Sequence, residues 1–118
     1  WQVLYNRFGD DFGYKNESAP FDELLQTWTK LPRNTQVRLG IGLAAYKSGQ
    51  HDSFAGTGAT EWLETENLLV KQASDALHHP AVSGIALYHS DALQNLPAAQ
   101  AAALREVIAT QIIREQAE

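Results

Sequence analysis

The chain contains no cysteine and no methionine among its 118 residues. Without cysteine it forms no disulfide, no thiol nucleophile and no thiolate metal site, and the sequence gives no indication of a redox compartment. No uninterrupted apolar run approaches the roughly 20 residues of a membrane-spanning helix. Basic residues are outnumbered, 9 against 14 acidic, for a net charge of −5. This balance argues against a nucleic-acid-binding module, which needs a basic surface.

The remaining composition is that of an ordinary globular protein. Hydrophobic residues make up 44% of the chain and charged residues 19%, which excludes a disordered tail. The length allows one small domain, so residues 1–118 are expected to form a single segment. Because the chain begins with Trp1 and has no methionine, we expect it to be part of a longer protein, with any targeting segment in the missing part.

Hydrophobic periodicity predicts three strand–helix units. The strands are expected at 2–5, 37–46 and 82–88, and the helices from Pro20 to Leu31, from 65 to 79, and from Pro97 through Ile112. This alternation predicts an α/β fold with three parallel strands. A three-stranded sheet has two open edges and a thin core. We therefore expect it either to pair with another copy or to belong to a larger sheet.

A tyrosine followed by polar residues ends each predicted strand. Parallel sheets place their binding sites beyond the carboxyl ends of their strands. A tyrosine ring has an apolar face and one hydroxyl, which suits a sugar ring. Trp62, in the second loop, is a further candidate for stacking. In the alternative interpretation, these tyrosines cap the core and their hydroxyls bond to backbone groups. The clusters are Tyr5-Asn6-Arg7, Tyr46-Lys47 and Tyr88-His89-Ser90-Asp91.

Candidate catalytic and metal-binding groups are less distinctive. Lys47 can contact a carboxylate or a sugar hydroxyl, or point to water. His89 has the reference pKa of a general acid or base but no carboxylate partner at a fixed spacing. His78 and His79 diverge on a helix and are expected to be structural, so no metal site is predicted. The acidic residues show no pair suited to glycoside cleavage, and no phosphate-binding glycine motif is present, so no cofactor is expected.

Nearly the whole chain resembles a known family. The segment Gly-Ile-Gly-Leu-Ala-Ala-Tyr-Lys-Ser-Gly at 40–49 is followed by a tryptophan-containing loop and by Val-Ser-Gly-Ile-Ala-Leu-Tyr at 82–88. The pattern is similar to that of the bacterial glycosyl-hydrolase-like 10 family. The most specific matches lie in the second predicted strand and the loop after it. The first predicted strand departs from the pattern, because the sixth strand of the family has Pro, Gln and Trp where this chain has Gln2, Val3 and Asn6. The matching residues are Tyr5, Gly42, Tyr46, Lys47, Gly49, Leu69, Gln72, Gly84 and Leu93.

The resemblance implies a fold, an activity and a location. Members of the family are (β/α)8 TIM barrels, so this chain would be the C-terminal part, βα units 6–8. The implied function is that of a fragment of a bacterial glycoside hydrolase acting on an envelope or extracellular glycan. Its catalytic carboxylates would belong to earlier strands, and the fragment alone would be inactive. The implied location is periplasmic, in the cell envelope or extracellular. The substrate-binding residues would be Tyr5, Arg7, Tyr46, Lys47, Trp62, Tyr88 and His89.

A second hypothesis remains open beside this one. The chain could be a non-catalytic carbohydrate-binding or interaction domain that associates through its open strand edges. Its partners would then be a glycan and another copy of itself, whereas in the enzyme hypothesis they are a glycan and the rest of the parent barrel. Neither hypothesis includes nucleic acid or a membrane span.

Overall fold

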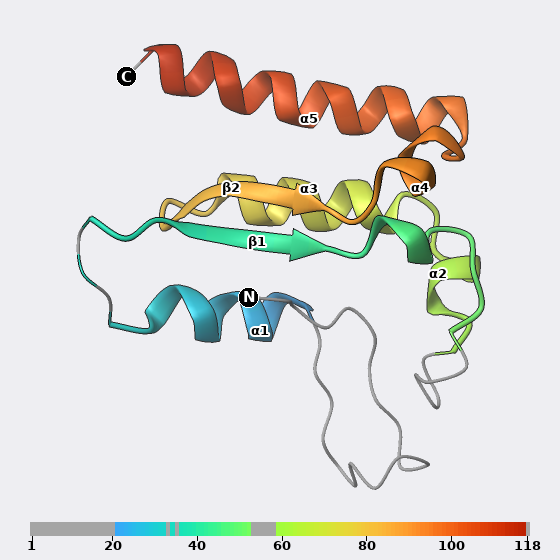
Figure 1. Ribbon diagram of the computed structural model, residues 1–118, viewed down its shortest axis with the longest axis horizontal. Coiled ribbons are helices and arrows are strands. Elements are labelled where there is room, and N and C mark those ends of the chain that lie inside the picture. Colours follow the sequence, from blue (N-terminus) through green and yellow to red (C-terminus); the bar gives the residue numbers. More distant parts are fainter. Residues whose placement is uncertain (1–20, 33, 35, 53–58, 118) are drawn as a thin grey trace, which may run out of the picture.

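The computed structural model describes residues 21–32, 34, 36–52 and 59–117, and it describes side chains as far as Gln111. Its two strands are separated along the chain by helical segments (Figure 1). In order they are α1 (Phe21–Lys30), β1 (Leu39–Leu43), the 3₁₀ helix η2 (Ala45–Lys47), α2 (Glu61–Glu64), α3 (Leu68–His78), β2 (Val82–Leu87), α4 (Ser90–Gln94) and α5 (Ala98–Ala117).

Strands β1 and β2 pair in parallel, and the chain crosses between them through α3. Leu39 lies opposite Val82, and after a shift of one residue Gly40 lies opposite Gly84. The register then runs without interruption to Leu43 opposite Leu87. Parallel strands need such a long crossover because the chain must return to the same end of the sheet.

The structure corrects the predicted fold class. In the described part of the chain the sheet has two strands, not three parallel βα units, and nothing in it indicates a barrel. The three parallel strands were predicted from hydrophobic periodicity, which does not report how many strands pair, and the barrel was implied by the family resemblance alone. The strand predicted at 2–5 lies outside the described residues. The other two predicted strands are confirmed in shorter form, as β1 and β2.

The two faces of the sheet differ sharply in side-chain size. Paired positions of parallel strands share a face, so Ile41 and Leu43 lie beside Ile85 and Leu87. The other face carries three glycines and one alanine: Gly40, Gly42, Gly84 and Ala86. Only the first face has side chains large enough to bury substantial apolar area.

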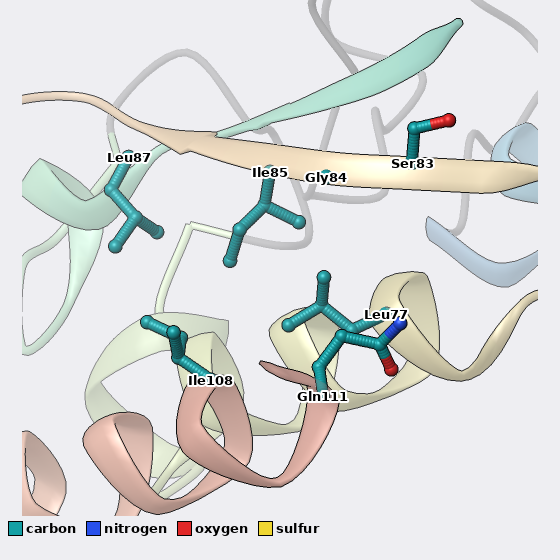
Figure 2. Close-up of a pocket in the computed structure, with 7 residues that line it drawn as sticks. All are labelled: Leu77, Ser83, Gly84, Ile85, Leu87, Ile108 and Gln111. Atoms are coloured by element: carbon teal, nitrogen blue, oxygen red, sulfur yellow. The ribbon is translucent and has the colours of Figure 1, made fainter. Parts of the chain in front are cut away.

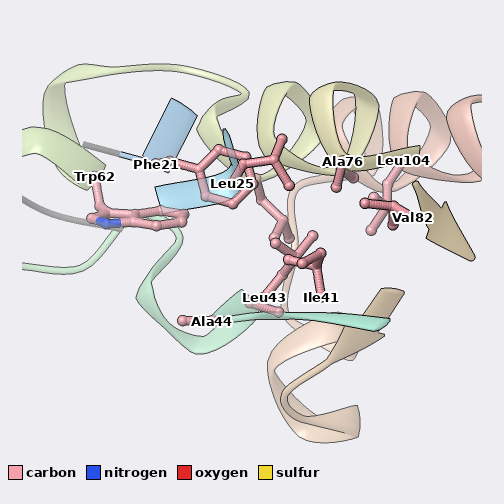
Figure 3. Packing of buried hydrophobic residues seen from close by; sticks show 12 residues of the cluster. Phe21, Leu25, Ile41, Leu43, Ala44, Trp62, Ala76, Val82 and Leu104 are labelled. Carbon is pink, nitrogen blue, oxygen red and sulfur yellow. The ribbon is translucent and has the colours of Figure 1, made fainter. Parts of the chain in front are cut away.

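Helices α1, α3 and α5 pack on the side of the larger side chains. Ile41 and Leu43 are each 1% exposed, and they share one buried cluster with residues from all three helices (Figure 3). The central helix is α3, which contacts both strands and α5. The buried residues of that cluster are Phe21, Leu25, Ile41, Leu43, Ala44, Ala45, Trp62, Leu69, Ala73, Ala76, Val82 and Leu104.

Small side chains let α3 approach the sheet closely. Ala73 and Ala76 have no exposed surface, and Leu69 is 2% exposed. Spacings of three and four residues place them on one side of the helix. The predicted helix at 65–79 is thus confirmed, although it begins three residues later, after Asn67 in the left-handed conformation (φ 58°).

No helix in the part of the chain that the structure describes has the length and apolar character required to cross a bilayer.

Replacing Leu69 with alanine tests this core. The substitution removes a nearly fully buried side chain, so the free energy of unfolding should fall by about 2–5 kcal/mol. Leu63→Ala is the matched control, because Leu63 is 51% exposed and should change stability by less than about 0.5 kcal/mol. Urea denaturation followed by circular dichroism measures both, and equal effects would contradict the packing described.

Candidate functional site

Backbone hydrogen bonds extend the strand pairing past the ends of β1 and β2. The Tyr88 N–H donates to the Leu43 carbonyl at 3.0 Å, and the Tyr46 N–H donates to the Tyr88 carbonyl at 3.1 Å. These bonds fix the backbone at both strand ends. The two tyrosines predicted to follow adjacent strands are therefore brought together at the carboxyl edge of the sheet.

The rings of Tyr46 and Tyr88 meet edge to face. Their centroids are 5.9 Å apart and their planes make an angle of 84°, the arrangement that aromatic quadrupoles favour. Tyr88 is nevertheless 65% exposed and Tyr46 41% exposed. A ring that only capped the core would be largely covered, so these exposures favour a surface role over the capping interpretation.

His89 extends this aromatic surface. Its ring centroid lies 5.0 Å from that of Tyr88, again nearly perpendicular at 86°. Its backbone precedes the short helix α4, and its carbonyl accepts a bond from the Leu93 N–H at 3.2 Å. We refer to the exposed side chains of Tyr46, Tyr88 and His89 as the aromatic edge.

Lys47, next to the aromatic edge, forms an ion pair with Asp52. Lys47 Nζ lies 2.6 Å from Asp52 Oδ2, and the two side chains are only 16% and 13% exposed. The Asp52 N–H also donates to the Ala59 carbonyl at 2.8 Å. The lysine charge is thus matched by a carboxylate that the surrounding loop holds in place.

The turn after η2 depends on a glycine. Gly49 has φ +71°, a conformation that L side chains rarely adopt. Its N–H donates to the Trp62 carbonyl at 3.2 Å, which ties the loop to α2. Lys47 is thus joined to Asp52 by the ion pair, and Gly49 is joined to Trp62 by this backbone bond.

The remaining predicted site residues are not part of this surface. Trp62 is 3% exposed and belongs to the core cluster, so its ring has no open face for a ligand. Tyr5 and Arg7 lie outside the described residues. The structure therefore brings together Tyr46, Lys47, Tyr88 and His89 from the predicted set, and places Trp62 beneath the surface.

Asp52 is the residue that the sequence reasoning missed. It follows Lys47 by five positions in a glycine-containing loop, where spacing alone does not bring two side chains together. The only available signal was the opposite charge of two residues flanking Gly49.

The two histidines at the end of α3 form hydrogen bonds with nearby backbone groups. His78 Nδ1 lies 2.7 Å from the Ser74 carbonyl oxygen, and His79 Nδ1 accepts a bond from the Ala81 N–H at 3.1 Å. Both contacts lie at the helix end, as the structural interpretation predicts. Among the described residues, no group of three or more histidine, aspartate or glutamate side chains is placed to hold a metal ion.

Comparisons with protein-family models, with curated proteins and with solved structures find no match to this chain. The resemblance to the glycosyl-hydrolase-like 10 family therefore stays a prediction that depends on the residues quoted for it.

A double-mutant cycle tests the Lys47–Asp52 pair. With the variants Lys47→Met and Asp52→Asn, we expect a coupling energy of about 1–2 kcal/mol in urea denaturation, because both side chains are largely buried. Lys71 and Asp75 provide a matched control. That pair is 3.5 Å apart, 72% and 43% exposed, and should couple by about 0.3–0.5 kcal/mol. A coupling no larger than the control would show that the pair does not hold the loop.

Proposed function

We propose that the aromatic edge binds carbohydrate. The observation that carries this proposal is the pair of exposed, perpendicular tyrosine rings at the ends of adjacent parallel strands. Strand pairing fixes their backbones, so little backbone ordering is needed when a ligand binds. Binding sites for small ligands are usually largely formed before the ligand arrives.

The chemistry of the edge suits a sugar better than a purely apolar ligand. Tyrosine combines a flat apolar ring with a hydroxyl that donates and accepts hydrogen bonds. Lys47 and Asp52 follow Tyr46 in the chain and supply a charge-balanced polar pair. An uncharged, hydroxyl-rich ligand can bond to such groups and lay its C–H face on a ring.

Under this proposal the chain forms part of the wall of the substrate-binding cleft but does not supply the catalytic carboxylates. Glycoside cleavage needs two carboxyl groups on either side of the bond, about 5–9.5 Å apart. Asp52 is engaged by Lys47, which makes it a counter-ion in a structural pair and not a free acid. The resemblance supports a role within a glycoside hydrolase of the bacterial envelope or exterior, with its acids supplied by other segments.

A non-catalytic carbohydrate-binding domain is the alternative, and it uses the same surface. The two tyrosine rings of the aromatic edge contact each other directly, and no other segment of the chain is needed for that contact. Binding without hydrolysis by the native full-length protein would favour this alternative, whereas hydrolysis would favour the enzyme.

Substitution of the most exposed ring tests carbohydrate binding directly. Tyr88→Ala should weaken glycan binding roughly tenfold, because it removes the apolar face, and tenfold corresponds to about 1.4 kcal/mol. Tyr88→Phe should stay within about threefold of the parent, because it keeps the ring. Isothermal titration calorimetry with chitohexaose, cellohexaose, mannohexaose and soluble peptidoglycan strands provides the measurement.

Two controls separate binding from folding. Leu63→Ala changes an exposed side chain on α2 and should leave binding unaltered. Trp62→Ala should destabilise the core, so its effect should appear in the unfolding curve. If the parent protein binds none of the four glycans, or if Tyr88→Ala binds as tightly as the parent, the proposed function is wrong.

A further inference from the structure

Strand β2 directs alternate backbone groups toward β1 and away from it. The N–H and the carbonyl of Tyr88 both point toward β1, where they bond to the Leu43 carbonyl and the Tyr46 N–H. Because these directions alternate along a strand, the N–H and carbonyl groups of Ile85 and Leu87 point to the opposite edge. Within the described residues, no strand pairs along that edge, and neither Ile85 nor Leu87 has a hydrogen bond to another segment there.

The regular part of this edge begins after Ser83. The irregularity in the pairing with β1 falls between Val82 and Gly84. The side chain of Ser83 points away from the helices, opposite to that of Ile85 (Figure 2). From Gly84 to Leu87 the register runs without interruption, and β2 contains neither a charged residue nor proline. Charges, proline and bulges are the usual protection of edge strands, so here only the irregularity at Ser83 protects the edge, and only at its start.

An apolar groove lies beside this edge, between β2 and α5. Its volume is about 300 Å³, far more than the roughly 30 Å³ of one water molecule. Figure 2 shows Ile85 and Leu87 pointing from the strand toward Leu77 of α3 and Ile108 of α5. None of the residues that line the groove is charged, and Ile85, Leu87 and Ile108 are each only partly buried. The edge therefore offers backbone groups and unfilled apolar space side by side.

We propose that the occupant of this edge is β2 of a second copy of the chain, paired antiparallel about a two-fold axis at Ala86. In this register Ile85 lies opposite Leu87 of the second copy, and Leu87 lies opposite its Ile85. Both residues direct their N–H and carbonyl groups outward, so each such pair exchanges two backbone hydrogen bonds. The two Ala86 residues face each other across the axis as a pair without hydrogen bonds between them, the closer kind of antiparallel pair.

Charge and side-chain exposure favour a second copy in this position. The chain has a net charge of −5, so two copies repel each other over most of their surfaces. They meet most favourably where both are uncharged, as β2 and the groove lining are. Ile85 and Leu87 keep part of their surface exposed in one chain, so they remain available to fill the groove of another. On the opposite face Gly84 and Ala86 are small, so no bulky side chain keeps the two strands apart.

This contact uses the same edge of both copies and is therefore closed. Once two copies have paired, neither has a free β2 edge, so association stops at the dimer. The inference goes beyond the proposed function and does not depend on it. Its test uses no glycan and changes no residue of the aromatic edge, so the failure of one proposal can be distinguished from the failure of the other.

Sedimentation velocity over a range of concentrations tests the dimer. The mass of the full chain should rise with concentration and level off at twice the mass of one chain. Ala86→Lys should weaken dimerisation at least tenfold, because it sets two like charges against each other at the axis. Ala86 is exposed, so the circular dichroism spectrum should stay that of the parent. Gln26→Lys adds the same charge at an exposed position of α1 and should dimerise like the parent.

Disulfide cross-linking tests the register, because the chain has no cysteine of its own. Ala86→Cys should form a covalent dimer under mild oxidation, since the facing Cα atoms would be about 4.5 Å apart. Ser83→Cys is the matched control. Ser83 is also small and exposed on β2, but its two copies would lie about 20 Å apart along the strands. It should cross-link at least tenfold more slowly.

Four results would overturn the proposal. They are a monomeric mass at every concentration, growth beyond the dimer, equal dimerisation of the parent and Ala86→Lys, and equal cross-linking of Ala86→Cys and Ser83→Cys. If Ala86→Lys loses the fold in circular dichroism, the parent and the two cysteine variants still decide the question.

Discussion

Parallel pairing of β1 and β2 is the constraint on which the rest of the structure depends. It places Leu43 beside Leu87, and the next backbone bonds carry the alignment to Tyr46 and Tyr88. A shift of one residue would turn every side chain of a strand to the opposite face. The aromatic edge and the one-sided core therefore come from the same register.

The glycine pattern gives this small sheet its asymmetry. Glycine and alanine line one face, so apolar burial is concentrated on the side of Ile41 and Leu43, where α1, α3 and α5 pack. A Cβ atom at Gly84 would meet no heavy atom within 4 Å, which shows that the small-residue face is open at this point. The well-packed face and the face that is open at Gly84 therefore result from the alternating pattern of the same two strands.

The sequence predicted the elements whose hydrophobic pattern is regular. The spacing of Leu69, Ala73 and Ala76 specified which side of α3 is buried, and the apolar run at 82–88 specified β2. Tyr46 and Tyr88 were placed correctly relative to each other, because parallel strands align their carboxyl ends. These inferences depend on local periodicity and on one general property of parallel sheets.

Other features depend on contacts that spacing does not encode. The number of strands in a sheet is set by pairing between distant segments, and three units with a barrel were predicted where the described sheet has two strands. Trp62 was expected in a loop, where an aromatic residue can face either solvent or core, whereas it lies in the short helix α2 and packs in the core. The Lys47–Asp52 pair requires the turn at Gly49. The sequence shows that a glycine is present there but does not show the conformation of the turn.

The register at the strand ends can be measured directly by nuclear magnetic resonance of the isotopically labelled protein. The account predicts nuclear Overhauser contacts between the methyl groups of Leu43 and Leu87, contacts between the rings of Tyr46 and Tyr88, and slow exchange of the Tyr88 amide hydrogen. Contacts that link Leu43 with Val82 and Leu39 with Leu87 would indicate antiparallel pairing and would contradict the account, as would a Tyr88 amide that exchanges as fast as in an unfolded chain.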